Sequence, residues 1–267
     1  MFELNCSHLT AINNLFFKKN CNISEHKNSK SKVDFMKKIK IIGENIIKNL
    51  IESFKNGRVD ENVQTEYKCH EVKDWLKIHE NCPPLYFHRN WDERKNPRES
   101  GASFIFHDTH NINVISVMED NDVFSDAAPI NDRTWEKGDV LEFFIQPPNS
   151  KSYFELHVAP NLATLQLAIP DANDLKNGKY KFEDLFADTD AEFGADKIET
   201  NNFKGWWGLI CIPAEKNGFQ IKNGHFANFA ACRYNYSRQR EKPECSSSAP
   251  LSKLSFHSPE EWQKLIL

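Results

Sequence analysis

The chain has 267 residues, enough for one large β-sandwich with an extension or for two small domains, and its 20 Phe and six Trp supply a hydrophobic core. Residues 1–60 carry eleven Lys and Arg against six Asp and Glu, whereas the rest carries 23 against 32. This acidic body argues against nucleic acid as the main partner, and no apolar run approaches the length of a membrane-spanning helix.

The first 66 residues are predicted to lie outside the main domain. Residues 1–35 are rich in Asn, Lys and Ser, lack the pattern of a signal peptide, and are expected to form a poorly ordered leader. Residues 36–66 are expected to form an amphipathic helix and a linker, because apolar side chains recur at spacings of three and four between positions 37 and 54. Packing of this helix on the main domain or on another chain is favoured over its use as a membrane-surface anchor or uncleaved signal.

The seven cysteines show no close pair of the CxxC kind, so the sequence does not indicate a zinc site. Their odd number leaves at least one thiol free. A disulfide between Cys69 and Cys82 is compatible with an oxidising compartment, but the spacing alone does not establish it.

Residues 67–267 are predicted to be all-β. The segment 67–85 fits an edge strand and turn, and further short strand-like runs occur at 103–107, 112–118, 140–146, 153–158, 163–169, 206–212 and 226–233. Because turn residues rather than helices separate these runs, we expect an antiparallel β-sandwich of two sheets. The acidic, weakly patterned interval 171–204 is expected to cross the edge of the sandwich.

The segment 135–160 is the most informative part of this pattern. Its two strands place Leu141, Phe143, Ile145, Phe154, Leu156 and Val158 on one face, and Glu142, Tyr153, Glu155 and His157 on the other. One face of such a hairpin is therefore apolar. The other is either a solvated surface or a site for a polar ligand.

Six segments in order resemble landmarks of family 9 carbohydrate-binding modules and their DOMON-like relatives. They are NVISVMEDNDV, TWEKGDVLEFFIQP, SYFELHVAPN, WWGLICIPAE, FANFAACRYNYS and LSFHSPEEWQKLIL. The resemblance covers about residues 67–267. It implies a jelly-roll or DOMON-like β-sandwich that binds carbohydrate without cleaving it. The implied role is accessory to polysaccharide or carbohydrate catabolism.

The resemblance also implies a site for a mono- or oligosaccharide. In the family, two aromatic rings clamp a terminal sugar, and the matching residues here are Trp135 and Phe256; Glu142 matches an acid that accepts hydrogen bonds from sugar hydroxyls. The chain departs from the family pattern where His157 replaces an arginine and where Phe256 replaces a tryptophan. Lys253 is the nearest polar substitute for an expected amide side chain.

Each candidate also has a structural interpretation. Trp135 is as compatible with capping the sandwich core as with ligand contact. For Phe256 a structural plug of the sandwich end is favoured over sugar contact, and for His157 a hydrogen-bonded surface imidazole is favoured over a ligand role. Glu142 is as compatible with a salt bridge across the sheet to Arg233 as with ligand contact. Glu155 and Arg233 are therefore regarded as supporting residues.

Two other classes of function stay open. In the first, Glu142 and Glu155 are the paired carboxylates of a glycoside hydrolase. In the second, Met118 and His157 hold a haem in a DOMON-type redox domain. No metal site is predicted, because Asp120 and Asp122, the candidates for a structural calcium ion, are too few to define one.

The resemblance further suggests a glycoside hydrolase as a partner and an extracellular or periplasmic location, although the chain shows no clear signal peptide.

Overall fold

The computed structural model describes residues 44–57 and 64–267, which all belong to one compact unit. The predicted leader 1–35, the first part of the predicted helix and residues 58–63 of the linker lie outside the described residues.

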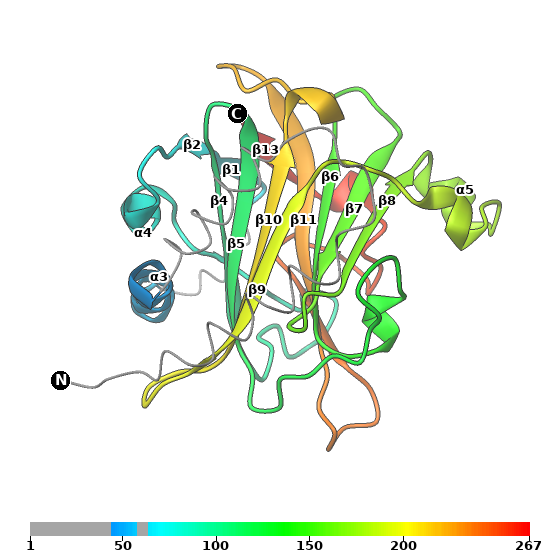
Figure 1. Ribbon diagram of the computed structural model, residues 1–267. Coiled ribbons are helices and arrows are strands. Elements are labelled where there is room, and N and C mark those ends of the chain that lie inside the picture. Colours follow the sequence, from blue (N-terminus) through cyan, green and yellow to red (C-terminus); the bar gives the residue numbers. More distant parts are fainter. Residues whose placement is uncertain (1–43, 58–63) are drawn as a thin grey trace, which may run out of the picture. The chain divides into compact units, whose positions relative to one another are not determined.

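Two β-sheets make up the body of this unit (Figure 1). The seven-stranded sheet has the order β1 (Glu66–Lys68), β13 (Gln263–Ile266), β11 (Phe226–Asn235), β6 (Val140–Gln146), β7 (Tyr153–Val158) and β8 (Thr164–Ile169), with β12 (Glu244–Ser247) paired to β11. The six-stranded sheet has the order β2 (His70–Glu71), β4 (Gly101–His107), β5 (Asn111–Glu119), β10 (Lys204–Pro213) and β9 (Glu192–Glu199), with β3 (Leu85–Tyr86) paired to β4. The pairs β1–β13 and β2–β4 are parallel, and the other named pairs are antiparallel.

The predicted β-sandwich is confirmed, and the seven strand-like runs from 103 to 233 are all strands. The segment 67–85 differs from the prediction, because it contains only β1, β2 and the start of β3, separated by a 3-10 turn η1 (Trp75–Lys77) and a short helix α4 (Ile78–Asn81). The interval 171–204 leads from β8, at one edge of the seven-stranded sheet, to β9, at one edge of the six-stranded sheet.

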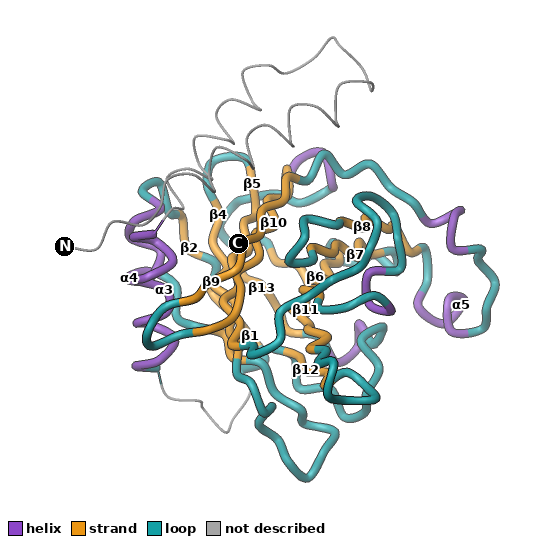
Figure 2. The backbone as a smooth tube through the Cα atoms, turned by 60° about the horizontal axis from the view of Figure 1, so that its bottom comes forward, coloured by secondary structure: helices purple, strands orange, loops and turns teal. Residues whose placement is uncertain are grey.

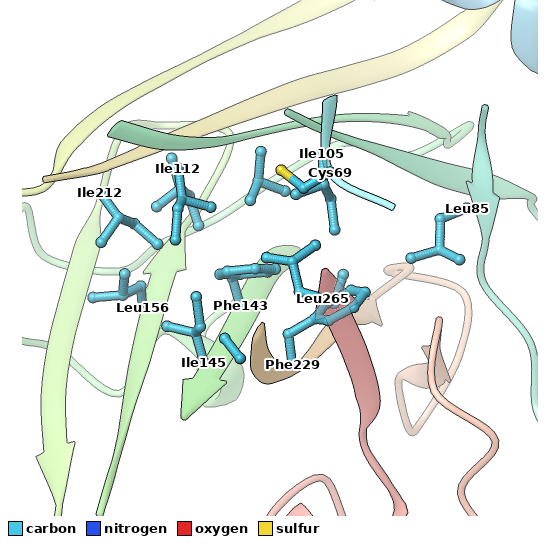
Figure 3. Packing of buried hydrophobic residues seen from close by; sticks show 14 of the residues in the cluster. Cys69, Leu85, Ile105, Ile112, Phe143, Ile145, Leu156, Ile212, Phe229 and Leu265 are labelled. Atoms are coloured by element: carbon cyan, nitrogen blue, oxygen red, sulfur yellow. The ribbon is translucent and has the colours of Figure 1, made fainter. Parts of the chain in front are cut away.

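The inner faces of the two sheets bury the main hydrophobic core. Phe143, Ile145 and Leu156 of the seven-stranded sheet lie opposite Ile112 and Ile212 of the six-stranded sheet (Figure 3), and all five are at most 1% exposed. Full burial of each such side chain contributes about 1.5–3 kcal/mol. The alternation predicted for β6 and β7 is thus confirmed on its apolar side.

The outer face of the seven-stranded sheet is covered as well. A second apolar cluster forms there between Phe144, Leu165 and Leu167 of the strands and Phe256 and Trp262 of the C-terminal segment. The short helix α5 (Ala172–Lys176) lies beside β8 (Figures 1 and 2), and the 3-10 turn η3 (Phe182–Leu185) contacts the same strand. This cover explains why every position of β6, inward or outward, is buried.

The helix α3 (Glu44–Asn56) corresponds to the second half of the predicted amphipathic helix. Ile46, Leu50 and Phe54 on its apolar side are buried, and the hydroxyl of Tyr86 donates a hydrogen bond of 2.5 Å to the carbonyl of Phe54. The helix packs against α4, η1 and β5, so its apolar face contacts the sandwich. Among the described residues, no helix has the length and apolar character needed to span a bilayer.

Five cysteines fall within the described residues, all are buried, and no disulfide joins any two of them: Cys69, Cys82, Cys211, Cys232 and Cys245. Cys69 and Cys82 are therefore not joined in this structure.

Candidate functional site

A cavity of about 490 Å³ lies on the outer face of the seven-stranded sheet. Its walls are largely aromatic, from Trp135, Tyr180, Phe182, Tyr234 and Phe256, and its polar lining includes Glu142, Glu155, Arg133, Lys176 and His257. The volume falls within the range of small-molecule sites, about 300–1,000 Å³. The structure thus brings Trp135, Glu142, Glu155 and Phe256 to one hollow.

Trp135 is held by the short 3-10 turn η2 (Thr134–Glu136) that precedes β6. The buried hydroxyl of Thr134 shares a hydrogen bond of 2.7 Å with Nδ1 of His157, and the hydroxyl of Tyr236 donates one of 2.6 Å to the carbonyl of Trp135. These two hydrogen bonds hold the turn in place, one at the residue before Trp135 and one at the carbonyl of Trp135. The indole itself is only half-buried and meets the ring of Phe182 edge-on at 5.7 Å.

The polar part of the cavity follows from the pairing of β6 with β7. Glu142 lies directly across from His157, and Glu155 lies two residues before His157 on the same face of β7. Nε2 of His157 is 2.8 Å from Oε1 of Glu155 and 3.3 Å from Oε1 of Glu142. All three side chains are nearly inaccessible, with at most 4% exposure.

Burial and the charges of neighbouring groups shift the pKa values of the three side chains in different directions. Desolvation raises the pKa of Glu142 to about 8, and the neighbouring Glu155 adds to the shift, although His157 opposes it. Burial would raise the pKa of Glu155 as well, but His257 and His157 outweigh it and hold that pKa below its usual value. Burial lowers the pKa of His157, yet the two carboxylates reverse the effect and raise it. At neutral pH we therefore expect a protonated Glu142 beside an ionised Glu155–His157 pair.

His157 contacts the cluster but not the cavity, because its side chain is fully buried beneath Trp135. It therefore orients Glu142 and Glu155 rather than presenting a surface imidazole.

Phe256 lines the cavity but is mainly a packing residue. Only 5% of it is exposed, and its ring contacts those of Trp91, Phe144 and Tyr234 at centroid distances of 5.4–6.4 Å. It offers much less surface to a ligand than Trp135 does.

Arg233 lies on the opposite face of the seven-stranded sheet and does not line the cavity. Its guanidinium donates to the carbonyls of Glu99 and Glu119 at 3.1 and 2.7 Å and lies 3.5 Å from the carboxylate of Asp120. The interpretation of Arg233 as the partner of Glu142 is therefore wrong. The reason is the two-residue period of β11, which directs residue 233 inward and Tyr234 toward the cavity.

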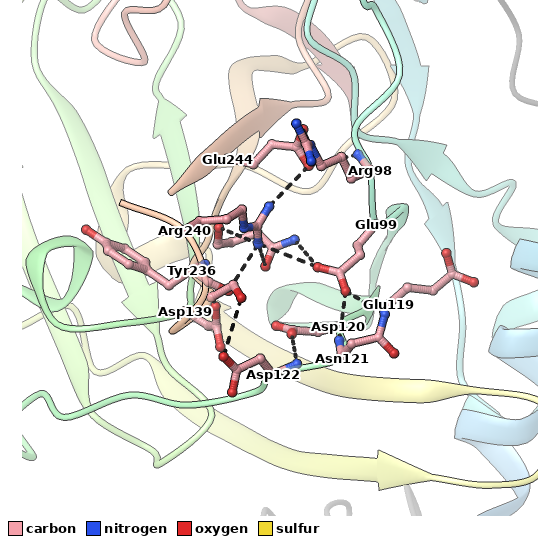
Figure 4. Close-up of polar contacts among 12 residues, drawn as sticks. Arg98, Glu99, Glu119, Asp120, Asn121, Asp122, Asp139, Tyr236, Arg240 and Glu244 are labelled. Atoms are coloured by element: carbon pink, nitrogen blue, oxygen red, sulfur yellow. Dashed lines mark hydrogen bonds and ion pairs between the residues drawn. The ribbon is translucent and has the colours of Figure 1, made fainter. Parts of the chain in front are cut away.

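The acidic turn near Arg233 does not fit a structural calcium ion. Asp120 faces Arg233, and Asp122 pairs with Arg238, so guanidinium groups already occupy both carboxylates. Figure 4 shows the surrounding network, in which Glu99 and Arg240 also take part.

A haem held by Met118 and His157 does not fit either. Met118 is buried in the core between the sheets, whereas His157 lies on the outer face of β7. The seven-stranded sheet separates the two side chains, so one iron is not able to bind both.

Several cavity residues were not identified from the sequence, among them Tyr234, His257, Arg133 and Phe182. Tyr234 was detectable in principle, because it follows the outward positions 230 and 232 of β11. His257 adjoins a predicted site residue. Arg133 and Phe182 carry no sequence signal: they meet only when η3 folds back over η2, where the guanidinium carbon lies 4.3 Å from the Phe182 ring centre.

Comparison with known proteins shows similarity at the level of structure. No protein-family model matches the chain, and no curated protein sequence is significantly similar to it. A solved structure from Bacteroides uniformis, provisionally described as a carbohydrate-binding protein, matches with a TM-score of 0.57 and 15% identity, covering 75% of this chain and 96% of that one.

Two structures of a family 9 carbohydrate-binding module from Caldicellulosiruptor kristjanssonii match as well. The complex with cellotriose gives a TM-score of 0.53 at 10% identity and covers 76% of this chain and 93% of that one. The complex with glucose gives 0.51 at 11% identity, with coverages of 75% and 95%. The chain therefore has a β-sandwich fold like that of family 9 carbohydrate-binding modules.

Proposed function

We propose that this protein binds a mono- or oligosaccharide, without cleaving it, in the cavity beside Trp135. The observation that carries the proposal is the meeting of a half-exposed indole and a buried carboxyl group, Glu142, in one hollow of suitable size. A pyranose needs both groups, because its C–H face stacks on an aromatic ring and its hydroxyls need directional partners. The solved structures of similar fold in complex with cellotriose and glucose support this assignment.

Within the proposed site, Trp135 is the stacking surface and Glu142 the main hydroxyl partner. Phe256 closes the cavity wall with a small contact, and Glu155 and His157 position Glu142 from below. On this proposal the protein acts as an accessory module, and a glycoside hydrolase is the partner to be expected.

The experiment is calorimetric titration with glucose, cello-oligosaccharides and a panel of other sugars. We expect affinities of about micromolar to millimolar, because a few contacts must offset the entropy lost on binding. Trp135→Ala should weaken binding at least about tenfold, and Trp135→Phe less, since it keeps a ring. Leu76→Ala, at an exposed residue of η1, is the matched control and should bind normally.

Undiminished binding by Trp135→Ala would contradict the site. Failure of every sugar in the panel to bind would contradict the function.

Glycoside hydrolysis is the second candidate, favoured by the two carboxyl groups in one cavity. An oxygen from each lies within 4.8 Å of the other, compared with a separation of about 5–5.5 Å between the carboxyl groups of retaining enzymes. Both, however, contact the same nitrogen of His157, whereas catalytic carboxyl groups flank the scissile bond. Release of reducing sugar that is abolished by Glu155→Gln would favour the enzyme over the binding module.

A further inference from the structure

His157 and His257 both direct their Nε2 atoms toward carboxyl groups that line the cavity. In His157, Nδ1 is held by the hydroxyl of Thr134 at 2.7 Å while Nε2 faces Glu142 and Glu155. In His257, Nδ1 is held by the hydroxyl of Tyr153 at 2.8 Å while Nε2 lies 3.9 Å from Oε2 of Glu155. Fixing one ring nitrogen by a hydrogen bond so that the other is directed at a common point is the arrangement found in metal-binding histidines.

No lysine or arginine neutralises the two carboxyl groups of the cluster. Glu142 and Glu155 are buried side by side, and among the described residues neither forms an ion pair with a lysine or arginine. Within the described chain, the polar contact of the Glu142 carboxyl group is with His157. The compensating positive charge is therefore that of the protons on Glu142 and His157, and a divalent ion that displaced these protons would supply it instead.

The distances also suit a metal ion. Ligand atoms of Glu142, Glu155 and His157 all lie within 4.8 Å of one another. A tetrahedral ion with ligands at about 2.0–2.1 Å separates neighbouring donor atoms by about 3.3–3.4 Å. The observed separations of 2.8 and 3.3 Å from Nε2 of His157 allow such an ion after small side-chain movements.

We propose that Glu142, Glu155 and His157 form a binding site for a divalent transition metal, and that His257, whose Nε2 lies 3.9 Å from Oε2 of Glu155, moves inward to become a fourth donor. The mixture of carboxylate oxygen and imidazole nitrogen suits Zn²⁺ or Co²⁺ and does not suit Ca²⁺, which takes six to eight oxygens. Both glutamates line the cavity, so the ion faces the space in which a ligand would bind. The proposal does not depend on sugar binding.

The test uses the full chain without a histidine tag, freed of metal by chelation and titrated with Zn²⁺ in the absence of sugar. We expect one ion per chain with a Kd of about micromolar or tighter, and Co²⁺ should give the visible absorption of a four-coordinate site. His157→Gln and Glu142→Gln should each weaken binding at least about 100-fold. Tyr153→Phe, which removes only the hydroxyl that holds His257, should weaken it about tenfold.

The matched control is His79→Gln, which removes a histidine of α4 whose Nε2 lies 4.0 Å from Glu80, away from the cavity. It should leave the affinity unchanged. If His157→Gln does not fold, His257→Gln at the half-buried cavity wall replaces it and should weaken binding at least about tenfold.

Absence of Zn²⁺ binding by the folded wild type would overturn the proposal, as would equal affinities of the wild type and the site variants. Trp135→Ala separates this proposal from sugar binding, because it should retain the metal while losing the sugar. Failure to bind metal would leave the sugar proposal standing.

Discussion

Glu142 combines two properties that rarely meet in one side chain: it lines a ligand-sized cavity, and it is almost fully buried. Its neighbours explain the combination. Outward positions of β6 and β7 are covered by the C-terminal segment, so the carboxyl group lies in a medium that disfavours its charge and beside a second acid. A carboxylic acid held neutral in this way donates one hydrogen bond and accepts others, which suits a sugar hydroxyl.

The stability that Glu142 contributes should therefore decrease as pH rises from about 4.5 to 8, and His157 adds to the decrease above about 6.5. The folded pKa of Glu142, about 8, exceeds its ordinary 4.5, so the folded state keeps a proton that the unfolded state releases. The raised pKa of His157 acts in the same direction: its contribution is complete below 6.5 and is lost as pH rises through the folded value. Glu155 has a lowered pKa, and its contribution is lost only at acid pH.

Urea unfolding at several pH values, with EDTA present, measures this effect. Glu142→Gln should show a shallower decline than the wild type, and Glu93→Gln, at an exposed glutamate, should follow the wild type. Parallel curves for the wild type and Glu142→Gln would show that Glu142 titrates normally.

At the scale of elements, the short turn η2 and the hairpin β6–β7 build the site together. Thr134 and His157 connect the turn to the hairpin through a buried hydrogen bond, and Trp135 lies directly above it. The position of the proposed stacking surface thus depends on the same imidazole that orients the two carboxyl groups. A site shared between a turn and a sheet in this way is rigid where it meets the ligand.

The helix α3 is an element whose role is structural in this arrangement. Leu50→Ala should lower the free energy of unfolding by about 2–5 kcal/mol, because it leaves a cavity where a fully buried side chain packs. Lys48→Ala, on the exposed side of the same helix, should change it by less than about 0.5 kcal/mol. Equal effects in chemical denaturation would mean that the helix is not docked, which would revive the membrane-anchor interpretation.

At the scale of the whole molecule, Arg233 connects the two sheets. It belongs to β11 of the seven-stranded sheet. Its guanidinium contacts the carbonyl of Glu119, the last residue of β5 in the six-stranded sheet, and the carboxylate of Asp120, the residue that follows β5. Removal of a buried cation lowers the stability of a protein strongly, because the carboxylate and carbonyl groups that it contacted then lose their charged partner.

Arg233→Ala should therefore destabilise the protein by about 3–5 kcal/mol in urea unfolding. Arg238→Ala is the matched control, since its pair with Asp122 is largely exposed and such pairs contribute about 0–1 kcal/mol. A loss for Arg233→Ala no larger than that of the control would show that the guanidinium does not join the sheets.

The β-sandwich and the facing of its strands could be predicted from the sequence, because the two-residue period of a strand is a local property that burial on one side makes visible. Phe143 and Leu156 were placed inward, and Glu142, Glu155 and His157 outward, without knowledge of any contact. Strands that are short or half-exposed were not predicted from the sequence: β9 is largely accessible, and β13 has only four residues. Their places depend on pairing partners far along the chain.

The contacts of the outward-facing residues could not be predicted in the same way, because they depend on how the chain folds back on itself. The C-terminal segment returns over β6 and β7, so the face that the alternation left as either a solvated surface or a polar-ligand site is the floor of a cavity, with His157 below it and His257 in its wall. Arg233 likewise acquired its surroundings from Glu99 and Glu119, more than a hundred residues away, and Tyr234 acquired its own from Glu142 and Glu155, about 80 to 90 residues away. The alternation of apolar and polar residues predicts the side of the sheet on which each residue lies. The segment that covers that side is determined by long-range packing, which no local pattern encodes.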